Sequence, residues 1–346
     1  MTSTHEHELV ESVDLATPDG RRLNPAARGW SRVPLHRANL RGSWGRNKRW
    51  DYWAILAGDL VVSAVYADID YLGLADVWWG RLDSGRTGGA GISRPGARGF
   101  HLPDVPGSEP LHAVSGDLDL EISDDSEGTT RLVATWTEKD GTPGALDAAI
   151  ALPDGHESMN VVIPWSERRF QYTSKHQARP VRGEFRVGDE LRRLEDEPRG
   201  AWGVLDVGRG RWPYRTVWNW GGGAGQLAPD GPTIGLQLGG KWTRDTGFTE
   251  NALIVDGRVS KLGEELEWTY DWDDPIRPWR VRDPGGRLDI VLEPTFDKHS
   301  RTSALVVQTE THQVFGSWRG ELTTDEGRRL AFEGIQGFAE ESRSRW

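Results

Sequence analysis

The chain has 346 residues, of which 53 are acidic and 42 are Lys or Arg, giving a net charge of -11. Its 36% hydrophobic content allows a substantial core, and its negative charge argues against nucleic acid or an anionic membrane as a partner. No cysteine is present, which excludes disulfides, thiol catalysis and zinc–thiolate sites.

The N-terminal residues 1–20 have neither a basic start nor an apolar run. This pattern is unlike a secretory signal, and we expect a disordered tail here. The longest apolar-leaning stretch, residues 55–71, is interrupted by three aspartates, so we expect no segment that spans a bilayer. The chain is therefore predicted to be soluble and cytoplasmic, without integral membrane association.

Alternation of apolar and polar residues predicts β-strands along most of the chain. Residues 117–122 and 131–137 alternate in the first half, and residues 264–270 and 287–292 alternate in the second. Such alternation places one face of a strand on a core and the other face in water. Asp256 followed by Gly257 predicts a tight hairpin, because both residues tolerate positive φ.

Helical patterns are scarce. Residues 189–197 predict a short charged helix, and a few more helical turns are expected after Asp274. A charged segment with Pro and Gly, residues 195–200, separates two strand-rich halves. We expect an all-β protein with two β-barrel or sandwich domains, residues 21–190 and 198–346.

Tryptophans crowd residues 200–225 of a chain that has 18 of them. Trp218 and Trp220, two residues apart on one strand, point the same way with about 7 Å between them. An indole is a wide apolar surface with a single N–H donor, which suits a lined cavity, although indoles also serve as core filler. The residues that we expect to form this site are Asp206, Arg209, Trp212, Tyr214, Trp218 and Trp220.

Two further patches combine carboxylates with aromatic or amide side chains. Glu250 and Asn251 open the strand before the predicted hairpin, and Asp271 lies between Tyr270 and Trp272. Burial against an indole raises the pKa of a carboxyl, which makes it a proton donor at neutral pH.

The candidate proton donors are therefore Asp206, Glu250 and Asp271. We expect Asp206 and Glu250 to face the Trp-lined cavity, one of them ionised against Arg209 and the other with a raised pKa. The alternatives are a structural ion pair between Asp206 and Arg209 and an exposed acidic loop around Asp271.

Other chemistries have weaker support. Outside His5 and His7 the histidines form no HxH or HExxH spacing, so no metal site is expected, and no cofactor is expected. A G-x-S-x-G nucleophile motif is absent, and the glycine runs lack the frame of a nucleotide site. Lysine is scarce, and Lys175 and Lys261 are predicted to be structural or exposed.

Several long motifs resemble the bacterial domain-of-unknown-function 2804 family: KRWDYWAIL, DVGRGRWPYRTVWNWGGGAG, IGLQLGGKWTRDTGFTENALIVDGRVSKL, HQVFGSWRGEL and GFAEESRSRW. This family is distantly similar to carotenoid hydratases, AttH-like proteins and tocopherol cyclases. The resemblance implies two tandem lipocalin-like domains and a small hydrophobic ligand. Val207 stands where the hydratase-like branch carries a histidine, so its hydratase chemistry does not transfer to this chain.

Two functions follow from these observations. One is an enzyme that acts on a small hydrophobic or terpenoid-like molecule by acid-initiated isomerisation, cyclisation or hydration. The other is a non-catalytic carrier or sensor of an apolar ligand. Carbohydrate binding on Trp platforms is chemically feasible, but nothing in the sequence is specific for it.

Overall fold

A computed structural model describes residues 4–304 and 307–345, and these residues form an all-β protein, as the alternation predicts. The described part of the chain has no α-helix, only the short 3-10 turns Pro25–Ala27 and Leu194–Asp196. No helix in this part is long and apolar enough to cross a membrane.

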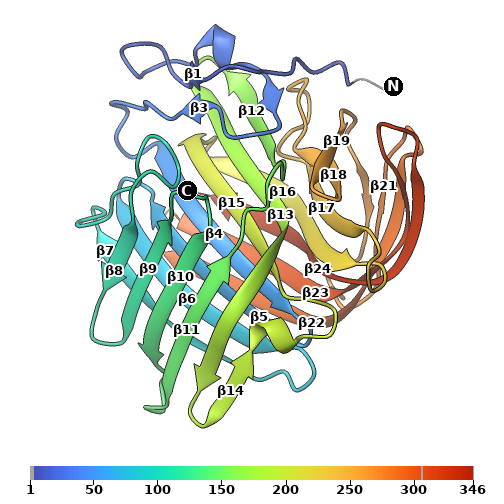
Figure 1. Cartoon of the computed structure of the whole chain (residues 1–346). Coiled ribbons are helices and arrows are strands. Elements are labelled where there is room, and N and C mark those ends of the chain that lie inside the picture. The colour runs from blue at the N-terminus through green and yellow to red at the C-terminus, as the bar shows by residue number, and fades with distance from the viewer. Residues whose placement is uncertain (1–3, 305–306, 346) are drawn as a thin grey trace.

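The first sheet has thirteen strands and curls into a near-barrel (Figure 1). Its main path is β7-β6-β5-β4-β15-β13-β11-β10-β9-β8, with β12, β14 and β2 paired off that path. The strands are β2 (Trp30–Ser31), β4 (Asn47–Ala57), β5 (Leu60–Asp68), β6 (Leu72–Arg81), β7 (Thr87–Pro95), β8 (Leu111–Val114), β9 (Leu118–Asp124), β10 (Thr130–Thr137), β11 (Pro143–Ile150), β12 (Met159–Ser166), β13 (Arg169–Val187), β14 (Glu190–Arg193) and β15 (Trp202–Arg211).

The second sheet has nine strands in the order β19-β18-β17-β16-β24-β23-β22-β21-β20 and forms a half-barrel beside the first. The strands are β16 (Arg215–Gln226), β17 (Thr233–Gly240), β18 (Asn251–Val255), β19 (Arg258–Leu262), β20 (Glu267–Thr269), β21 (Trp279–Arg282), β22 (Leu288–Ala304), β23 (Val307–Thr323) and β24 (Arg329–Arg345). A separate parallel pair joins β1 (Val13–Asp14) and β3 (His36–Arg37).

The two sheets divide after β15, not at residues 195–200. Strand β15 begins beyond that segment, yet it pairs with β4 and β13 in the middle of the first sheet. The predicted helix at residues 189–197 is wrong, because β14 continues the ladder by pairing with the end of β13 and a 3-10 turn follows. Sheet pairing outweighs the weak helical propensity of this charged segment.

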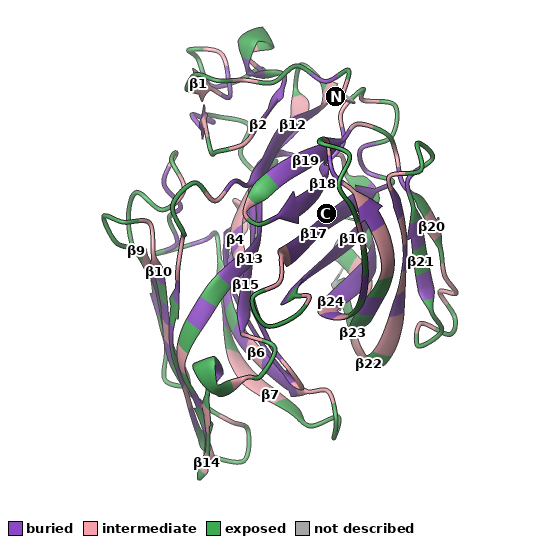
Figure 2. Cartoon of the chain, turned by 45° about the vertical axis from the view of Figure 1, so that its right-hand side comes forward, coloured by how far each residue is buried: buried purple, intermediate pink, exposed green. Residues whose placement is uncertain are grey.

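Burial follows the two-residue period of the strands. Along β10 alternate residues are buried and exposed, so one face packs inside the near-barrel. Where the first sheet faces the second, its strands are covered on both sides. Strand β15, for example, has no exposed residue (Figure 2). The predicted hairpin is present: Asp256 and Gly257 join β18 to β19 with φ of 50° and 76°.

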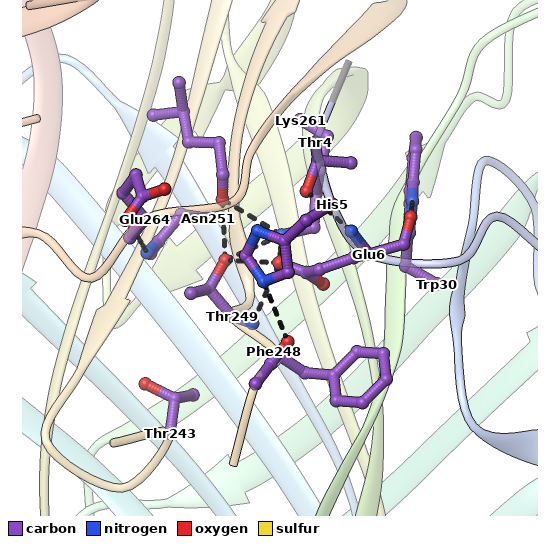
Figure 3. Close-up of polar contacts among 12 residues, drawn as sticks. Thr4, His5, Glu6, Trp30, Thr243, Phe248, Thr249, Asn251, Lys261 and Glu264 are labelled. Atoms are coloured by element: carbon purple, nitrogen blue, oxygen red, sulfur yellow. Dashed lines mark hydrogen bonds and ion pairs between the residues drawn. The ribbon is translucent and has the colours of Figure 1, made fainter. Parts of the chain in front are cut away.

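The N-terminal segment is ordered, which corrects the expected disorder of residues 1–20; residues 1–3 lie outside the described part. Leu15 is fully buried, and Glu6 reaches the second sheet, where its Oε1 lies 2.7 Å from Lys261 Nζ (Figure 3). The same oxygen accepts a hydrogen bond from the Thr249 backbone N–H at 3.1 Å. Both Glu6 and Lys261 are buried, and burial lowers the pKa of Lys261 despite the carboxylate beside it.

We expect Glu6→Gln to release the N-terminal segment from the second sheet. Removing one partner of a buried ion pair leaves the other charge unpaired, at a cost of about 3–5 kcal/mol. Hydrogen exchange measured by mass spectrometry should show lost protection at Leu9 and Leu15, whose amides donate to backbone carbonyls in the native fold.

Glu8→Gln is the matched control, because Glu8 pairs with Arg32 at a half-exposed position. Exposed pairs of this kind contribute at most about 1 kcal/mol. Equal loss of protection in the two variants would contradict a specific role for the buried Glu6–Lys261 pair.

Candidate functional site

One ammonium group lies between carboxylates from the two sheets. Lys175 Nζ is 2.8 Å from Asp206 Oδ1 and 3.3 Å from Glu250 Oε2. All three residues are buried, with 4%, 8% and 1% of their surface exposed. An unpaired charge at such a depth is very unfavourable, so this arrangement ties the sheets together electrostatically.

Strand register explains why these groups meet. Lys175 on β13 pairs with Asp206 on β15, which in turn pairs with Tyr52 on β4, so the three side chains share the face that looks toward the second sheet. Glu250 belongs to the second sheet's side of this layer and is the residue directly before β18. Thr173 Oγ1, two residues before Lys175, donates to Asp206 Oδ1 at 3.2 Å.

Indole N–H groups donate to each carboxylate of this layer. Trp50 Nε1 lies 3.1 Å from Asp206 Oδ2, and Trp242 Nε1 lies 2.6 Å from Glu250 Oε1. A third indole, that of Trp218, donates to Oε1 of a further buried carboxyl, Glu340 on β24, at 2.8 Å. The indoles therefore satisfy buried oxygens as well as filling space.

Trp212 is the centre of the aromatic packing around these carboxylates. Its ring lies 5.2 Å from that of Trp242, in a stacked arrangement, and 5.7 Å from that of Trp218. Trp50 and Trp165 contact it at 5.8 and 5.1 Å. These rings come from both sheets, so the layer between the sheets is largely aromatic.

Lys175 also lies over an aromatic face. Its Nζ is 4.5 Å from the centroid of the Trp220 ring, within the range of a cation–π contact. Trp220 in turn donates its N–H to Gln237 Oε1, which also accepts from Gln177 Nε2. Polar groups from β13, β16 and β17 thus continue the hydrogen-bonded layer beyond the ion cluster.

Two glycines make room for the site. A Cβ on Gly239 would lie 2.2 Å from Glu250 Oε1, and one on Gly208 would lie 2.1 Å from the Trp50 indole. Neither approach is sterically tolerable, so any larger residue would displace the carboxylate or the indole. The glycines of the Trp-rich segment and of β17 therefore have a direct packing role here.

Burial and charge tune the ionisable groups in different directions. Burial opposes the charged form of Lys175, but the carboxylates of Asp206 and Glu250 outweigh it and raise the pKa of the ammonium. Burial raises the pKa of Glu250, with Lys175 opposing that shift. Burial raises the pKa of Glu340 to about 7, against the hydrogen bond from Trp218. Near neutral pH the site thus contains the charged ammonium of Lys175 and, at Glu340, a carboxyl that is partly protonated.

A second polar patch lies farther along the contact between the sheets. Lys298 on β22 has its Nζ 4.1 Å from the centroid of the Trp78 ring on β6. Burial lowers the pKa of this lysine to about 8 and raises that of Asp76. The layer between the sheets therefore contains titratable groups beyond the Lys175 ion cluster.

A groove of about 870 Å³ opens between the sheets near the end of β4. Gln336 on β24 bridges it by donating to and accepting from the backbone of Gly58. Its walls include Trp202 from the first sheet and Ala224 from the second. The volume lies in the range of small-molecule sites.

The structure brings together five of the residues singled out from the sequence: Asp206, Glu250, Trp212, Trp218 and Trp220.

Arg209 is not the counter-ion of Asp206. Its Nη2 lies 2.7 Å from Asp51 Oδ1. Asp51 lines a separate cavity of about 150 Å³ in the near-barrel, together with Val207. Adjacent residues of β15 point to opposite faces, which explains why 206 and 207 line different spaces.

The other residues singled out lie outside the ion cluster. Tyr214 is exposed in the link between the sheets, under Arg345. Asp271 lies in a half-exposed loop, 3.7 Å from Arg277. Asn251 uses its side chain to bond the backbone of β17 and of Glu264 rather than to orient Glu250.

Tyr270 and Trp272 belong to the half-barrel wall. Tyr270 stacks on Trp279 with a ring separation of 3.8 Å, and its hydroxyl bonds Glu341. Trp272 packs against Arg343, whose guanidinium lies 3.6 Å from the ring centroid.

Sequence reasoning missed Lys175, Glu340, Trp50 and Trp242 as members of the site. The sequence alone predicts a structural or exposed Lys175, because one lysine in a strand carries no signal of its partners. Glu340 and Glu341 interrupt the pattern of β24 with two adjacent acids. In a strand, such a pair must send one carboxylate to each face, which is a usable signal for a buried acid when both faces are covered.

Replacing Glu340 by Gln should stabilise the protein at alkaline pH. The folded state holds the Glu340 proton up to about pH 7, whereas an unperturbed glutamate has a pKa of 4.5. The stabilisation of the folded state by the proton on Glu340 is therefore fully present below about pH 4.5 and is lost as the pH rises through about 7. Urea unfolding at several pH values should show the variant gaining on the wild type by up to about 3 kcal/mol, since one pKa unit corresponds to 1.36 kcal/mol.

Glu333→Gln provides the control, because Glu333 is an exposed carboxylate on the same strand. Its unfolding free energy should follow the wild-type pH profile. A Glu340→Gln profile that also runs parallel to the wild type would mean that the Glu340 carboxyl has no raised pKa.

Known structures of similar fold share little sequence with this chain. Kievitone hydratase from Nectria haematococca aligns with a TM-score of 0.53 at 12% identity, over 97% of this chain and 96% of that chain. CghA with Sch210972 aligns with a TM-score of 0.44 at 11% identity, over 87% and 89% of the two chains. A candidate AttH from Nitrosomonas europaea gives 0.46 at 12% identity, over 86% and 92%. At these identities the likeness to kievitone hydratase is one of fold.

No curated protein matches the chain. A family model described as a domain of unknown function, DUF2804, matches residues 6–346, which is nearly the full length. The motifs that make up the site, from the Trp-rich segment to the paired glutamates of β24, all lie inside this match. The chain therefore belongs to the DUF2804 family.

Proposed function

We propose that this protein binds a small apolar molecule between its two sheets and transfers a proton to it from Glu340. The observation that carries the proposal is the Glu340 carboxyl, which is buried in a layer of indoles and accepts a hydrogen bond from Trp218. Burial raises the pKa of this carboxyl to about 7. A general acid works best when its pKa lies near the working pH. The reaction class is acid-initiated hydration, isomerisation or cyclisation.

The aromatic rings suit the charge that such a reaction develops. Protonation of a carbon–carbon double bond leaves a carbocation. Trp218 donates its N–H to Glu340, and Trp220 is the register partner of Glu340 on the neighbouring strand, so both indoles lie close to the proposed donor. Each ring in cation–π contact contributes about 0.5–2 kcal/mol. The Lys175–Asp206 pair is neutral as a unit, so it does not oppose the developing charge as an isolated ammonium would.

Ligand binding requires room between the sheets, and the groove near Gly58 lies along the same strand as Glu340, which is four residues beyond the groove-lining Gln336. Its 870 Å³ is enough for a small molecule, and its walls come from both sheets. The hydratase from Nectria shares this fold and is named for addition of water, a reaction that begins with proton transfer in the acid-catalysed case. These points support a ligand-transforming role over a purely structural one.

The first experiment identifies the ligand class. Purified protein is extracted with organic solvent, and the extract is analysed by mass spectrometry against an extract of the Trp218→Ala/Trp220→Ala variant. We expect an apolar compound to be enriched with the wild type. No enrichment of any apolar compound would count against the binding site.

The second experiment tests proton transfer. The enriched compound, or an apolar extract of metabolites, is incubated with the protein in D2O. A product formed by acid-initiated chemistry gains a carbon-bound deuterium, which mass spectrometry detects. Glu340→Gln should slow its formation by about 10²–10⁴-fold, the usual contribution of a general acid.

Asp271→Asn is the matched control for this assay, since Asp271 is a candidate acid from the sequence that lies in a half-exposed loop. Its rate should equal that of the wild type. Glu250→Gln separates the two buried acids: a larger loss with this variant would make Glu250 the donor. If the apolar compound is enriched but neither the wild type nor any variant forms a deuterated product, the protein is a carrier and not an enzyme.

A further inference from the structure

Four side chains gather on one face of the β22–β23 ladder, away from the ion cluster. His299 on β22 is directly opposite His312 on β23 in the register. Asp297 lies two residues before His299, and Glu310 lies two residues before His312. The two-residue period places all four side chains on the same face.

The distances within this group are short. The two imidazole rings are parallel, with centroids 4.2 Å apart, and His299 Nε2 lies 3.2 Å from Glu310 Oε1. One potential ligand atom from each of His299, Glu310 and His312 can be chosen so that all three lie within 4.8 Å of one another.

Asp297 holds one of the histidines in place. Its Oδ2 lies 2.8 Å from His312 Nδ1. The side chains of these two residues are 18% and 12% exposed, so the pair is largely shielded from water. A carboxylate bonded to Nδ1 fixes the ring and leaves Nε2 as the free nitrogen, which is the usual outer contact of a metal-bound histidine.

We propose that His299, Glu310 and His312 bind a divalent first-row transition-metal ion, with Asp297 as the residue that orients His312. Two imidazoles and one carboxylate are the donor set of zinc and related ions, whereas magnesium and calcium prefer oxygen ligands alone. Asp297 and Glu310 together supply two negative charges to a dication.

The geometry needs only a small adjustment. Ligands at about 2.1 Å from a tetrahedral zinc lie about 3.4 Å from one another, so the three atoms must close by at most about 1.4 Å. His299 and Glu310 are partly exposed, with 45% and 34% of their side chains accessible, and are free to make this movement. Three protein ligands also leave a position open for water or another molecule.

This site is separate from the proposed proton donor. On β24, Glu341 is the register partner of His312, so the histidines share the face of Glu341 and not that of Glu340. Trp272 closes one side of the site, with its ring perpendicular to His312 at 4.6 Å. A failure of either proposal therefore leaves the other intact.

The test measures zinc binding by the full chain. The protein is first dialysed against a chelator, and the chelator is then removed. Isothermal titration with zinc chloride should show one site that a large excess of magnesium does not displace. Asp297→Asn should weaken binding by about 10–100-fold, the usual effect of losing an outer contact to a metal-bound histidine. The His299→Gln/His312→Gln variant should lose the site.

His5 and His7 near the N-terminus provide the control, because they are the most closely spaced histidines in the sequence. The His5→Gln/His7→Gln variant should bind zinc with wild-type affinity. The proposal is overturned if the His299→Gln/His312→Gln variant, with an unchanged unfolding transition, binds zinc as the wild type does, or if the site disappears with the tail histidines instead.

Discussion

The buried ammonium of Lys175 is the interaction on which the relation between the two sheets depends. It comes from the first sheet, and it lies within ion-pair distance of one carboxyl from its own sheet, Asp206, and another from the second, Glu250. Buried ion pairs contribute little to net stability, because desolvation offsets the attraction, but breaking one costs about 3–5 kcal/mol. Sliding one sheet over the other would leave such a charge unpaired. The cluster therefore favours the observed arrangement of the two sheets over shifted ones.

The aromatic layer around the cluster has the same selective character. A layer of Leu and Val would tolerate small shifts between sheets, because apolar contact is not directional. Here the indoles of Trp50, Trp218 and Trp242 each donate to a particular carboxylate oxygen. Most of the contact area in this layer is therefore apolar, but the hydrogen bonds of the indoles fix how the sheets are positioned. This explains why tryptophan is used where smaller apolar side chains would fill the volume.

Much of the fold could be predicted from local sequence, because strand alternation and turn chemistry are local properties. The hairpin at Asp256 and the shared face of Trp218 and Trp220 depend only on neighbours in the chain. The all-β class is confirmed for the same reason. The strand at residues 190–193 was missed because its partner on β13, and not its own composition, decides its conformation.

The site was only half predictable, because it depends on register between distant strands. Asp206 and Arg209 are close in sequence, yet they lie on opposite faces of β15, and the true partner of Asp206 is Lys175 on the next strand. His299 and His312 are likewise thirteen positions apart and meet only because β22 and β23 pair in one register. No spacing rule for contiguous motifs identifies such pairs.

The docking of Glu6 on Lys261 has a consequence for how the protein is made. These residues are separated by 255 positions, so a chain growing from its N-terminus emerges for tens of seconds, at about 5–20 residues per second, before Glu6 has a partner. Strand β4 waits in the same way for β15, whereas the β4–β5–β6–β7 hairpins have all their neighbours at hand. The segment around Glu6 is made well before its partner and is thus among the last to pack, because its docking requires that β19 has already been synthesised.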